Sequence, residues 1–413
     1  MKNTTTHTRI MKKKVCFYII SLVLLVSGTA NSQSFTNYTT ANGLPDNNVN
    51  GVVVDSNNVK WFGTQSGVAR FNDVTWQVFT TADGLVDNYI NCIAVDKNNH
   101  IWVGTDIGAC FYNGLNWKTY TTADGLINNT ISYITAGADG NVWIGTGSGM
   151  SKFDGTTFTN YTTSNGLPSN MVSYIAVDGS NNVWIGTWIG GLAKFDGTSF
   201  RTLTTLDGLP VDNITSIAID KAGNKYVGTF SGVAVLDSTD TFVRNFTSAN
   251  GLFNNYVQDL DLDSHSQVWA AIYADYLQEG GLSRYNQATW SSFSVGDGLV
   301  NNLVRRLTVD KTDHVWIATG QGVSDYYPGS YGISEIAMEA ESVYPNPAHE
   351  QLVIRHKNND SVLSLYDATG KESLTSILTG ENTCIDIQSL QPGIYLLRIR
   401  DANKVYSSKI IIQ

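Results

Sequence analysis

The chain has 413 residues, with 26 basic and 36 acidic side chains and a formal net charge of −10. The first 32 residues contain basic residues but no acidic one, so the remainder is more acidic than the whole chain. This balance argues against nucleic acid and anionic membrane surfaces as partners. The length leaves room for more than one domain.

The N-terminal segment, residues 1–32, has the features of a secretory signal. Lys12–Lys14 form a basic end, Val15–Val26 an apolar run, and Ala30–Ser32 the small residues that precede a cleavage site. We expect cleavage before Gln33. An uncleaved anchor is the alternative, but the apolar run is short for crossing a bilayer, so the mature protein is not expected to span the membrane.

Residues 33–330 contain one pattern seven times. Each copy opens on a Gly-Leu pair, at Gly43, Gly84, Gly125, Gly166, Gly208, Gly251 and Gly298. A period near forty residues is typical of propeller blades. The second copy predicts four short strands, with turns rich in Asn, Asp and Gly between them, at 90–95, 100–105, 109–112 and 117–121. Because one such sheet cannot cover both of its apolar faces, the sequence predicts an all-β fold, a seven-bladed β-propeller.

Two polar positions recur in nearly every copy. An Asp stands six residues before an aromatic residue, as at Asp55 and Trp61, although the third copy has Gly137 there. An Asn stands four residues after the opening Gly, and the fifth copy has Asp212 in its place. A group needed once for chemistry would not be copied into most blades, so we assign these residues to turns and hydrogen bonds. The Asp turns offer oxygen atoms to Ca²⁺ but too few ligands for a strong site, and no cofactor is expected.

The histidines and cysteines of the repeats do not predict a metal or disulfide site. His100 and His314 fall in equivalent turns of blades two and seven, which are not adjacent. Cys92 and Cys110 fall in the first and third strands of one blade, about 9–10 Å apart. That separation is beyond the reach of a disulfide. The sequence also lacks the common motifs of nucleophilic, zinc-dependent and phosphate-binding sites.

A four-residue motif marks the second strand of most blades. It occurs as WFGT, WVGT, WIGT, WIGT and YVGT at Trp61, Trp102, Trp143, Trp184 and Tyr226. With the Gly and the aromatic-Asp or aromatic-Asn turn that follow it, this motif resembles the two-component-regulator propeller family, over roughly residues 34–327. In that family such propellers often form the periplasmic sensor region of hybrid kinases. This chain has no kinase or receiver segment, so the resemblance does not imply phosphotransfer here.

The two ends of the repeat region complement each other. Residues 35–40 have the sequence FTNYTT, which recurs at 158–163 as the fourth strand of a blade. The seventh copy ends near Tyr327 after three strands. We therefore expect the N-terminal strand, residues 34–40, to complete blade seven and close the ring, which removes an exposed sheet edge.

The pattern changes after a linker at residues 331–341. Residues 342–413 contain no Trp and no copy of the repeat. They predict a small C-terminal β-sandwich domain, with strands at 352–355, 362–366, 384–387, 393–399 and 409–412.

Four segments of this domain resemble, in order, the C-terminal sorting domain of the type IX secretion system of Bacteroidetes. They are Val343–Pro347, Leu365–Lys371, Leu390–Leu397 and Lys409–Gln413. The resemblance implies that the type IX machinery is a partner of residues 342–413. It also implies passage from the periplasm across the outer membrane, removal of the domain, and release or attachment at the cell surface. An ordinary adhesive β-domain is the alternative.

Residues that depart from the repeat are the candidates for ligand binding. The turn after the W-x-G-T position holds Trp188, Phe230 and Tyr273 in blades four to six, and a longer loop in blade six adds Tyr276. We expect them side by side on the face that carries the Gly-Leu loops. Exposed aromatic rings suit stacking on sugars or contact with a peptide, and packing between loops is the alternative.

Charged residues at the channel form the second candidate group. Asp259 lies in the first strand of blade six, and Arg305 and Arg306 lie in that of blade seven. They are candidates for ligand contact, with ion pairing between neighbouring blades as the plainer explanation. The other first strands carry mostly Asn, Ser, Thr, Gly, Tyr and Cys. This favours a module that binds an extracellular glycan or protein, or an adhesion protein, over a lyase or glycoside hydrolase-like enzyme.

Overall fold

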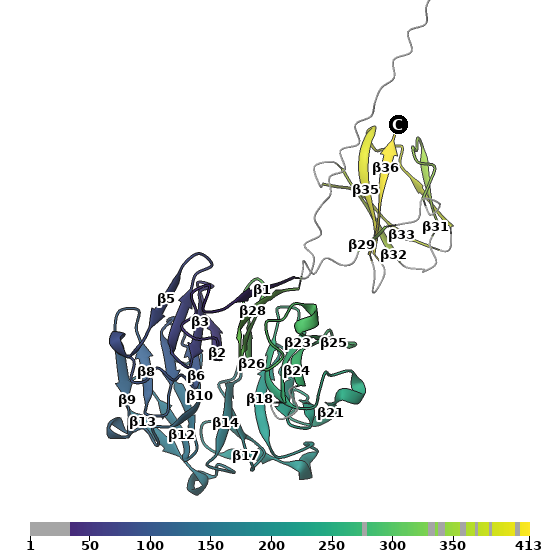
Figure 1. Cartoon of the computed structure of the whole chain (residues 1–413). Helices are drawn as coiled ribbons and strands as arrows, with labels where there is room; N and C mark the ends of the chain where they lie inside the picture. The colour runs from purple at the N-terminus through teal and green to yellow at the C-terminus, as the bar shows by residue number, and fades with distance from the viewer. Residues whose placement is uncertain are drawn as a thin grey trace, which may run out of the picture.

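The structure is a computed structural model. It describes residues 34–274, 279–328, 335–337, 343–355, 361–367, 371–379, 382–400 and 405–413. Seven four-stranded antiparallel sheets stand in a ring around a central channel (Figure 1). The all-β, seven-bladed propeller predicted from the repeats is therefore confirmed. The expected signal segment, 1–32, and the candidate Tyr276 lie outside the described residues.

In each blade the first strand lines the channel and the later strands follow outward. The strands of blades one and two are β2 (Val49–Val54), β3 (Lys60–Thr64), β4 (Gly67–Phe71), β5 (Trp76–Phe79), β6 (Cys92–Val95), β7 (Ile101–Gly104), β8 (Ala109–Tyr112) and β9 (Trp117–Tyr120). Those of blades three and four are β10 (Ile131–Ala136), β11 (Val142–Thr146), β12 (Gly149–Phe153), β13 (Phe158–Tyr161), β14 (Val172–Val177), β15 (Val183–Thr187), β16 (Leu192–Phe195) and β17 (Phe200–Leu203).

Blades five to seven continue the same order. Their strands are β18 (Ile214–Ile219), β19 (Lys225–Thr229), β20 (Gly232–Leu236), β21 (Phe242–Phe246), β22 (Val257–Leu262), β23 (Val268–Ala274), β24 (Glu279–Tyr285), β25 (Trp290–Phe293), β26 (Val304–Val309), β27 (Val315–Thr319) and β28 (Gly322–Tyr327). Short 3-10 turns lead from the outer strand of one blade toward the next. They are η1 (Thr81–Asp83), η2 (Thr122–Asp124), η3 (Thr163–Asn165), η4 (Thr205–Asp207), η5 (Ser248–Asn250) and η7 (Val295–Asp297).

The recurring polar residues build these turns. In blade one, Asp83 Oδ2 accepts the backbone N–H of Thr80 at 2.8 Å, and Gly84 follows with a φ of 109°, which favours glycine. Asn88 Oδ1 then accepts the backbone N–H of Thr81 at 2.8 Å. The same bond occurs in all seven units, with Asp212 as the acceptor in the fifth. The assignment of this position to a turn hydrogen bond is confirmed.

The recurring Asp forms a hydrogen bond within its blade, and the glycine of the W-x-G-T motif lies at the contact with the next blade. Asp55 Oδ2 accepts Nε1 of Trp61 at 3.3 Å, and equivalent bonds form in blades four, six and seven. The glycine of the motif permits close contact, because a Cβ on Gly104 would lie 2.6 Å from Cγ2 of Ile131 in the next blade. The described residues contain no group of three or more potential metal-ligating side chains.

The N-terminal strand β1 (Ser34–Tyr38) completes blade seven. It pairs antiparallel with β28, from Ser34 opposite Tyr327 to Tyr38 opposite Val323. The ring of Phe35 lies 4.7 Å from that of Tyr326. Because this strand comes from the start of the repeat region, the ring is closed by hydrogen bonds between its two ends.

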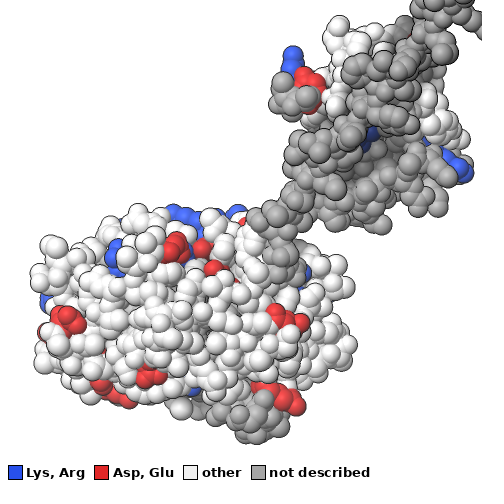
Figure 2. Space-filling model, turned by 45° about the horizontal axis from the view of Figure 1, so that its top comes forward, with Lys and Arg blue, Asp and Glu red and all other residues white. Residues whose placement is uncertain are grey.

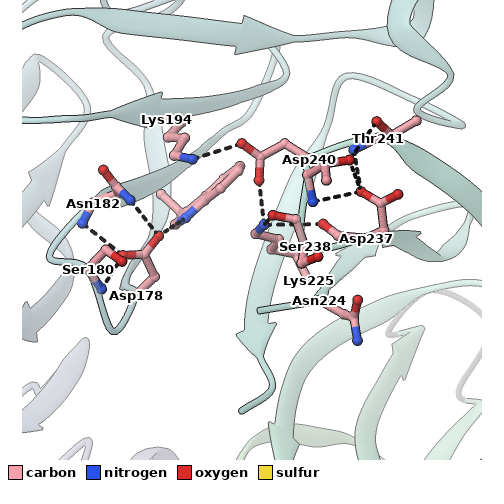
Figure 3. A network of polar contacts seen from close by, with 12 residues as sticks. Asp178, Ser180, Asn182, Lys194, Asn224, Lys225, Asp237, Ser238, Asp240 and Thr241 are labelled. Atoms are coloured by element: carbon pink, nitrogen blue, oxygen red, sulfur yellow. Dashed lines mark hydrogen bonds and ion pairs between the residues drawn. The ribbon is translucent and has the colours of Figure 1, made fainter. Parts of the chain in front are cut away.

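A buried ion cluster joins blades four and five (Figure 3). Nζ of Lys194 in blade four donates to Oδ2 of Asp240 at 2.8 Å. Nζ of Lys225 in blade five contacts the other carboxylate oxygen. Burial alone would raise the pKa of Asp240, but the hydrogen bonds from both lysines outweigh it and hold the pKa below its ordinary value.

The C-terminal domain consists of two sheets around one apolar core. The five-stranded sheet has the order β29 (Glu335–Ala337), β36 (Val405–Ile412), β35 (Gly393–Arg400), β32 (Ser361–Tyr366) and β33 (Glu372–Leu378). The three-stranded sheet has the order β30 (Val343–Tyr344), β31 (Gln351–Arg355) and β34 (Asn382–Asp386). The core includes Leu352, Leu365, Leu397 and Ile410. The sequence pattern missed β33, an edge strand whose residues are mostly exposed.

Candidate functional site

The candidate site lies on the propeller face that carries the Gly-Leu loops. This face also carries the turn after the W-x-G-T position in each blade, because alternate strands of a blade run in opposite directions. Figure 2 shows that Lys, Arg, Asp and Glu side chains are scattered over the visible side of the propeller. Other residues form most of that surface. Local groups of residues therefore matter more than a broad charged field.

Three aromatic rings from neighbouring blades form a contiguous group, which we call the aromatic ladder: Trp188, Phe230 and Tyr256. The ring centres of Trp188 and Phe230 lie 5.9 Å apart, and those of Phe230 and Tyr256 lie 5.5 Å apart. Trp188 is 36% exposed and Phe230 is 37% exposed. Their neighbour Ile189 is also exposed. Trp188 and Phe230 are thus partly accessible, and Tyr256 is half-buried beside them.

The structure brings together two of the predicted rings and adds one that the sequence analysis missed. Trp188 and Phe230 are adjacent as predicted, and Tyr256 extends the group into blade six. Tyr273 is half-buried and lines a pocket at the channel mouth. Tyr256 occupies the position directly after the recurring Asn. That position varies among the blades as Asn48, Tyr89, Thr130, Met171, Asn213, Tyr256 and Leu303, and this variation was the available signal.

A polar pocket of about 290 Å³ opens at the centre of the same face. We call it the mouth pocket. Its lining consists of amides, phenols and two arginines, contributed by Asn50, Gln65, Tyr89, Asn91, Gln258, Tyr273, Arg305 and Arg306. Among its tyrosines, Tyr89 is 41% exposed, and its hydroxyl accepts a hydrogen bond from Nε2 of Gln65 at 3.3 Å.

Arg305 is held at the mouth pocket by blade one. Its Nη1 donates to Oδ1 of Asn50 at 2.6 Å, and its Nη2 donates to Oδ1 of Asn48 at 3.4 Å. Both acceptors are neutral amides. No carboxylate of the described residues lies within ion-pairing distance of Arg305.

Arg306, the next residue, crosses the channel. It forms an ion pair with Asp259 of blade six, with 3.7 Å between Nη1 and Oδ1. Its guanidinium also lies over the rings of Tyr133 and Tyr174, which belong to blades three and four, at 5.4 and 5.8 Å from their centres. Those two rings are themselves 4.1 Å apart. Ion pairing between blades six and seven therefore involves Arg306 and Asp259, whereas Arg305 contacts blade one.

The bridge formed by Arg306 separates the mouth pocket from a second cavity. Arg306 lines both spaces, and the second has a volume of about 430 Å³ and reaches the turns on the opposite face, near Asp220 and Asp263. Burial raises the pKa of Asp259, although Arg306 opposes the shift. Burial raises the pKa of Cys92, beside the same cavity, to about 12, which makes its thiol a poor nucleophile.

The two carboxylates in the first strand of blade six accept hydrogen bonds from the backbone of blade seven. Oδ2 of Asp259 accepts the N–H of Leu307 at 3.0 Å, and Oδ2 of Asp261 accepts the N–H of Val309 at 2.9 Å. Burial is also the main cause that raises the pKa of Asp261 to about 6. These contacts align two inner strands, which is a structural use of both carboxylates.

The family comparisons match both parts of the chain. The model described as two component regulator propeller matches residues 84–106, 125–148 and 166–189. The model described as secretion system C-terminal sorting domain matches residues 342–413. The chain therefore contains repeats that match the two component regulator propeller model and a C-terminal segment that matches the secretion sorting domain. No curated protein matches the sequence.

Solved structures share the propeller fold. The extracellular domain of BT3049 from B. thetaiotaomicron, named for a hybrid two component system, is 19% identical with a TM-score of 0.63. The alignment covers 92% of this chain and 57% of that one. PorZ, a surface component of the type IX secretion system of Porphyromonas gingivalis, is 17% identical with a TM-score of 0.60, over 89% of this chain and 60% of that one.

An enzyme also shares the architecture. Virginiamycin B lyase from Staphylococcus aureus is 11% identical with a TM-score of 0.58, over 71% of this chain and 99% of that one. Identities this low show a common fold and leave function to the site residues. The sorting domain indicates export to the cell surface or the medium. No helix in the described part of the chain is long and apolar enough to cross a membrane.

Proposed function

We propose that this exported propeller is a non-catalytic binding module whose ligand is an extracellular glycan. The observation that carries the proposal is the aromatic ladder. Trp188 and Phe230 expose their rings at positions where other blades have Gln65, Asp106 or Gly147. Exposed aromatic faces next to polar groups suit stacking on sugar rings.

The mouth pocket supports the same ligand class. Its amide and phenol groups donate and accept hydrogen bonds, as neighbouring sugar hydroxyls require. Its volume of about 290 Å³ lies at the lower end of small-molecule sites, which span roughly 300–1,000 Å³. It therefore suits one unit of a longer chain that continues over the ladder.

A protein ligand is the second candidate, because exposed aromatic rings also anchor protein interfaces. A propeller enzyme acting on extracellular polysaccharide is the third. The channel acids Asp259 and Asp261 accept backbone hydrogen bonds from blade seven. That use supports a binding role over a catalytic one.

The test is a glycan array probed with the purified protein, followed by calorimetric titration of each glycan that binds. Replacing Trp188 with Ala should weaken binding by about fivefold or more, because a stacked ring contributes roughly 1 kcal/mol or more. Ile107→Ala is the matched control, since Ile107 is an exposed apolar residue on the corresponding turn of blade two. Equal affinity of the Trp188→Ala variant and the native protein would contradict the proposal.

We further propose that residues 342–413 direct the export by type IX secretion. Cells of the native host that produce a chain ending before Val343 should retain the propeller in the periplasm. Fractionation with an antibody against the propeller measures this. Normal amounts of the truncated protein at the surface or in the medium would refute the proposed route.

A further inference from the structure

Arg305 places a positive charge in the mouth pocket that no carboxylate of the described residues neutralises. Its two hydrogen bonds go to the amide oxygens of Asn50 and Asn48. These bonds use only part of the donor capacity of a guanidinium and fix its direction. Arg306, its neighbour in sequence, is by contrast paired with Asp259. A guanidinium that is oriented but not paired is suited to an anionic partner, above all a carboxylate.

Gly320 leaves this guanidinium uncovered. It occupies in blade seven the turn position that holds Trp188, Phe230 and Tyr273 in blades four to six. A Cβ on Gly320 would lie 3.7 Å from Nη2 of Arg305, and no atom outside the adjacent residues of the chain would lie closer. A large side chain at this position would therefore extend beside the guanidinium, whereas glycine leaves space for a ligand.

We propose that the mouth pocket binds the carboxylate of a uronic acid unit through Arg305. This inference rests on the proposed glycan-binding function and specifies the ligand as an acidic polysaccharide. The guanidinium forms charge-assisted hydrogen bonds to the carboxylate. The amide of Gln258 and the phenols of Tyr89 and Tyr273 also line the pocket, where they would form hydrogen bonds with sugar hydroxyls.

The lining of the pocket favours a sugar acid over an acidic peptide. It contains no aliphatic side chain that would hold a peptide residue. The neighbouring aromatic ladder supplies a surface on which further sugar rings stack.

The experiment measures calorimetric binding of the exported protein to galacturonate, glucuronate and mannuronate oligosaccharides. Each probe is paired with its carboxyl-reduced form, which keeps the sugar ring and loses the charge. We expect at least one native uronate to bind about tenfold or more tightly than its reduced form. Arg305→Gln should remove this preference by lowering the affinity for the native uronate to about that for its reduced form, while Arg305→Lys should keep part of it.

Two control pairs separate a local effect from a general one. Arg244→Gln makes the same change in net charge on the exposed outer strand β21 and should leave binding unchanged. Gly320→Trp should abolish uronate binding by covering Arg305. Gly147→Trp introduces the same ring at the equivalent turn of blade three, where a Cβ meets no atom within 4 Å, and should have no effect. Circular dichroism checks that each variant is folded.

Several outcomes would overturn the inference. Equal affinity for native and carboxyl-reduced oligosaccharides would contradict a carboxylate site in the mouth pocket. Full uronate binding by Arg305→Gln would contradict it as well. If neutral glycans still bind in a manner that depends on Trp188, the proposed function survives that result. Absence of binding to every uronate probe, or tighter Arg305-dependent binding of oligoglutamate than of any uronate, would reject the uronic acid ligand.

Discussion

The guanidinium of Arg306 in blade seven lies 5.4 Å from the ring centre of Tyr133 in blade three, on the other side of the channel. The same guanidinium pairs with Asp259 of blade six. The side chain of Arg306 thus connects blade seven with blades six and three across the central channel. It also sets the inner boundary of the mouth pocket, which it lines together with Arg305.

Replacing Arg306 with Gln should lower the free energy of unfolding by about 3 kcal/mol or more. The reason is that Asp259 would remain buried without a cationic partner. Chemical denaturation of the purified protein measures the change. The double variant that also carries Asp259→Asn should recover part of the loss, and a double variant less stable than the single one would show that the pair is not the cause.

Deleting residues 34–38 should strongly lower the melting temperature. The deletion removes β1 and exposes the edge of β28 together with the ring of Tyr326, which Phe35 covers. The milder variant Phe35→Ala should cost about 2–3 kcal/mol, because the ring is only partly buried. Thermal unfolding followed by circular dichroism tests both variants. A melting curve that the deletion leaves unchanged would refute closure of the ring by β1.

Replacing Asp240 with Asn should destabilise the propeller by about 2 kcal/mol. Among the described residues, Asp240 is the carboxylate that pairs with both Lys194 and Lys225, and Lys225 is almost fully buried. Asp73→Asn is the matched control in the corresponding turn of blade one. Its side chain is 54% exposed, and its partner Lys60 keeps a second carboxylate, that of Asp310, at 3.8 Å. We expect a clearly smaller loss there, and equal losses would argue against burial as the deciding factor.

The stability of blade seven should depend on pH through His314. Nδ1 of His314 lies 2.7 Å from Oδ1 of Asp325, and this hydrogen bond raises the pKa of the imidazole above its ordinary value. A raised folded-state pKa means that the stabilisation is complete below about pH 6.5 and is lost as the pH rises through the folded pKa.

The corresponding measurement is the free energy of unfolding across this pH range. The free energy of unfolding of the native protein should decline above about pH 6.5, and His314→Gln and Asp325→Asn should each make this decline smaller. Both variants should be compared with the native protein by denaturant titration at each pH. If both variants show the native decline in full, the pair is not its source.

Much of the scaffold could be predicted from sequence because its determinants are local. The recurring Asn at position 88 bonds a backbone N–H seven residues earlier. Position 84 requires glycine because its φ is 109°, which residues with a side chain rarely adopt. The complementary ends of the repeat region indicated that β1 completes blade seven, where it pairs with β28. Each of these features depends on a short stretch of chain or on a repeat that shows it several times.

The candidate site was only partly predictable. The sequence indicated Trp188 and Phe230 because they interrupt a regular pattern, and their rings are in contact. It did not indicate Tyr256, which lies in a different loop from the predicted Tyr273. Strand β33 was missed for a related reason, since an edge strand with mostly exposed residues lacks a clear apolar alternation.

By itself, then, the sequence determined the blades, their turns and the sorting domain, because these follow from local backbone preferences and from contacts between adjacent repeats. Only the tertiary structure decided what the central residues contact. Arg305 and Arg306 are adjacent in sequence, yet one is held by Asn50 of blade one and the other reaches Tyr133 of blade three. Neighbouring residues on a strand point to opposite sides, and the partners that they meet depend on the curvature and closure of the whole ring.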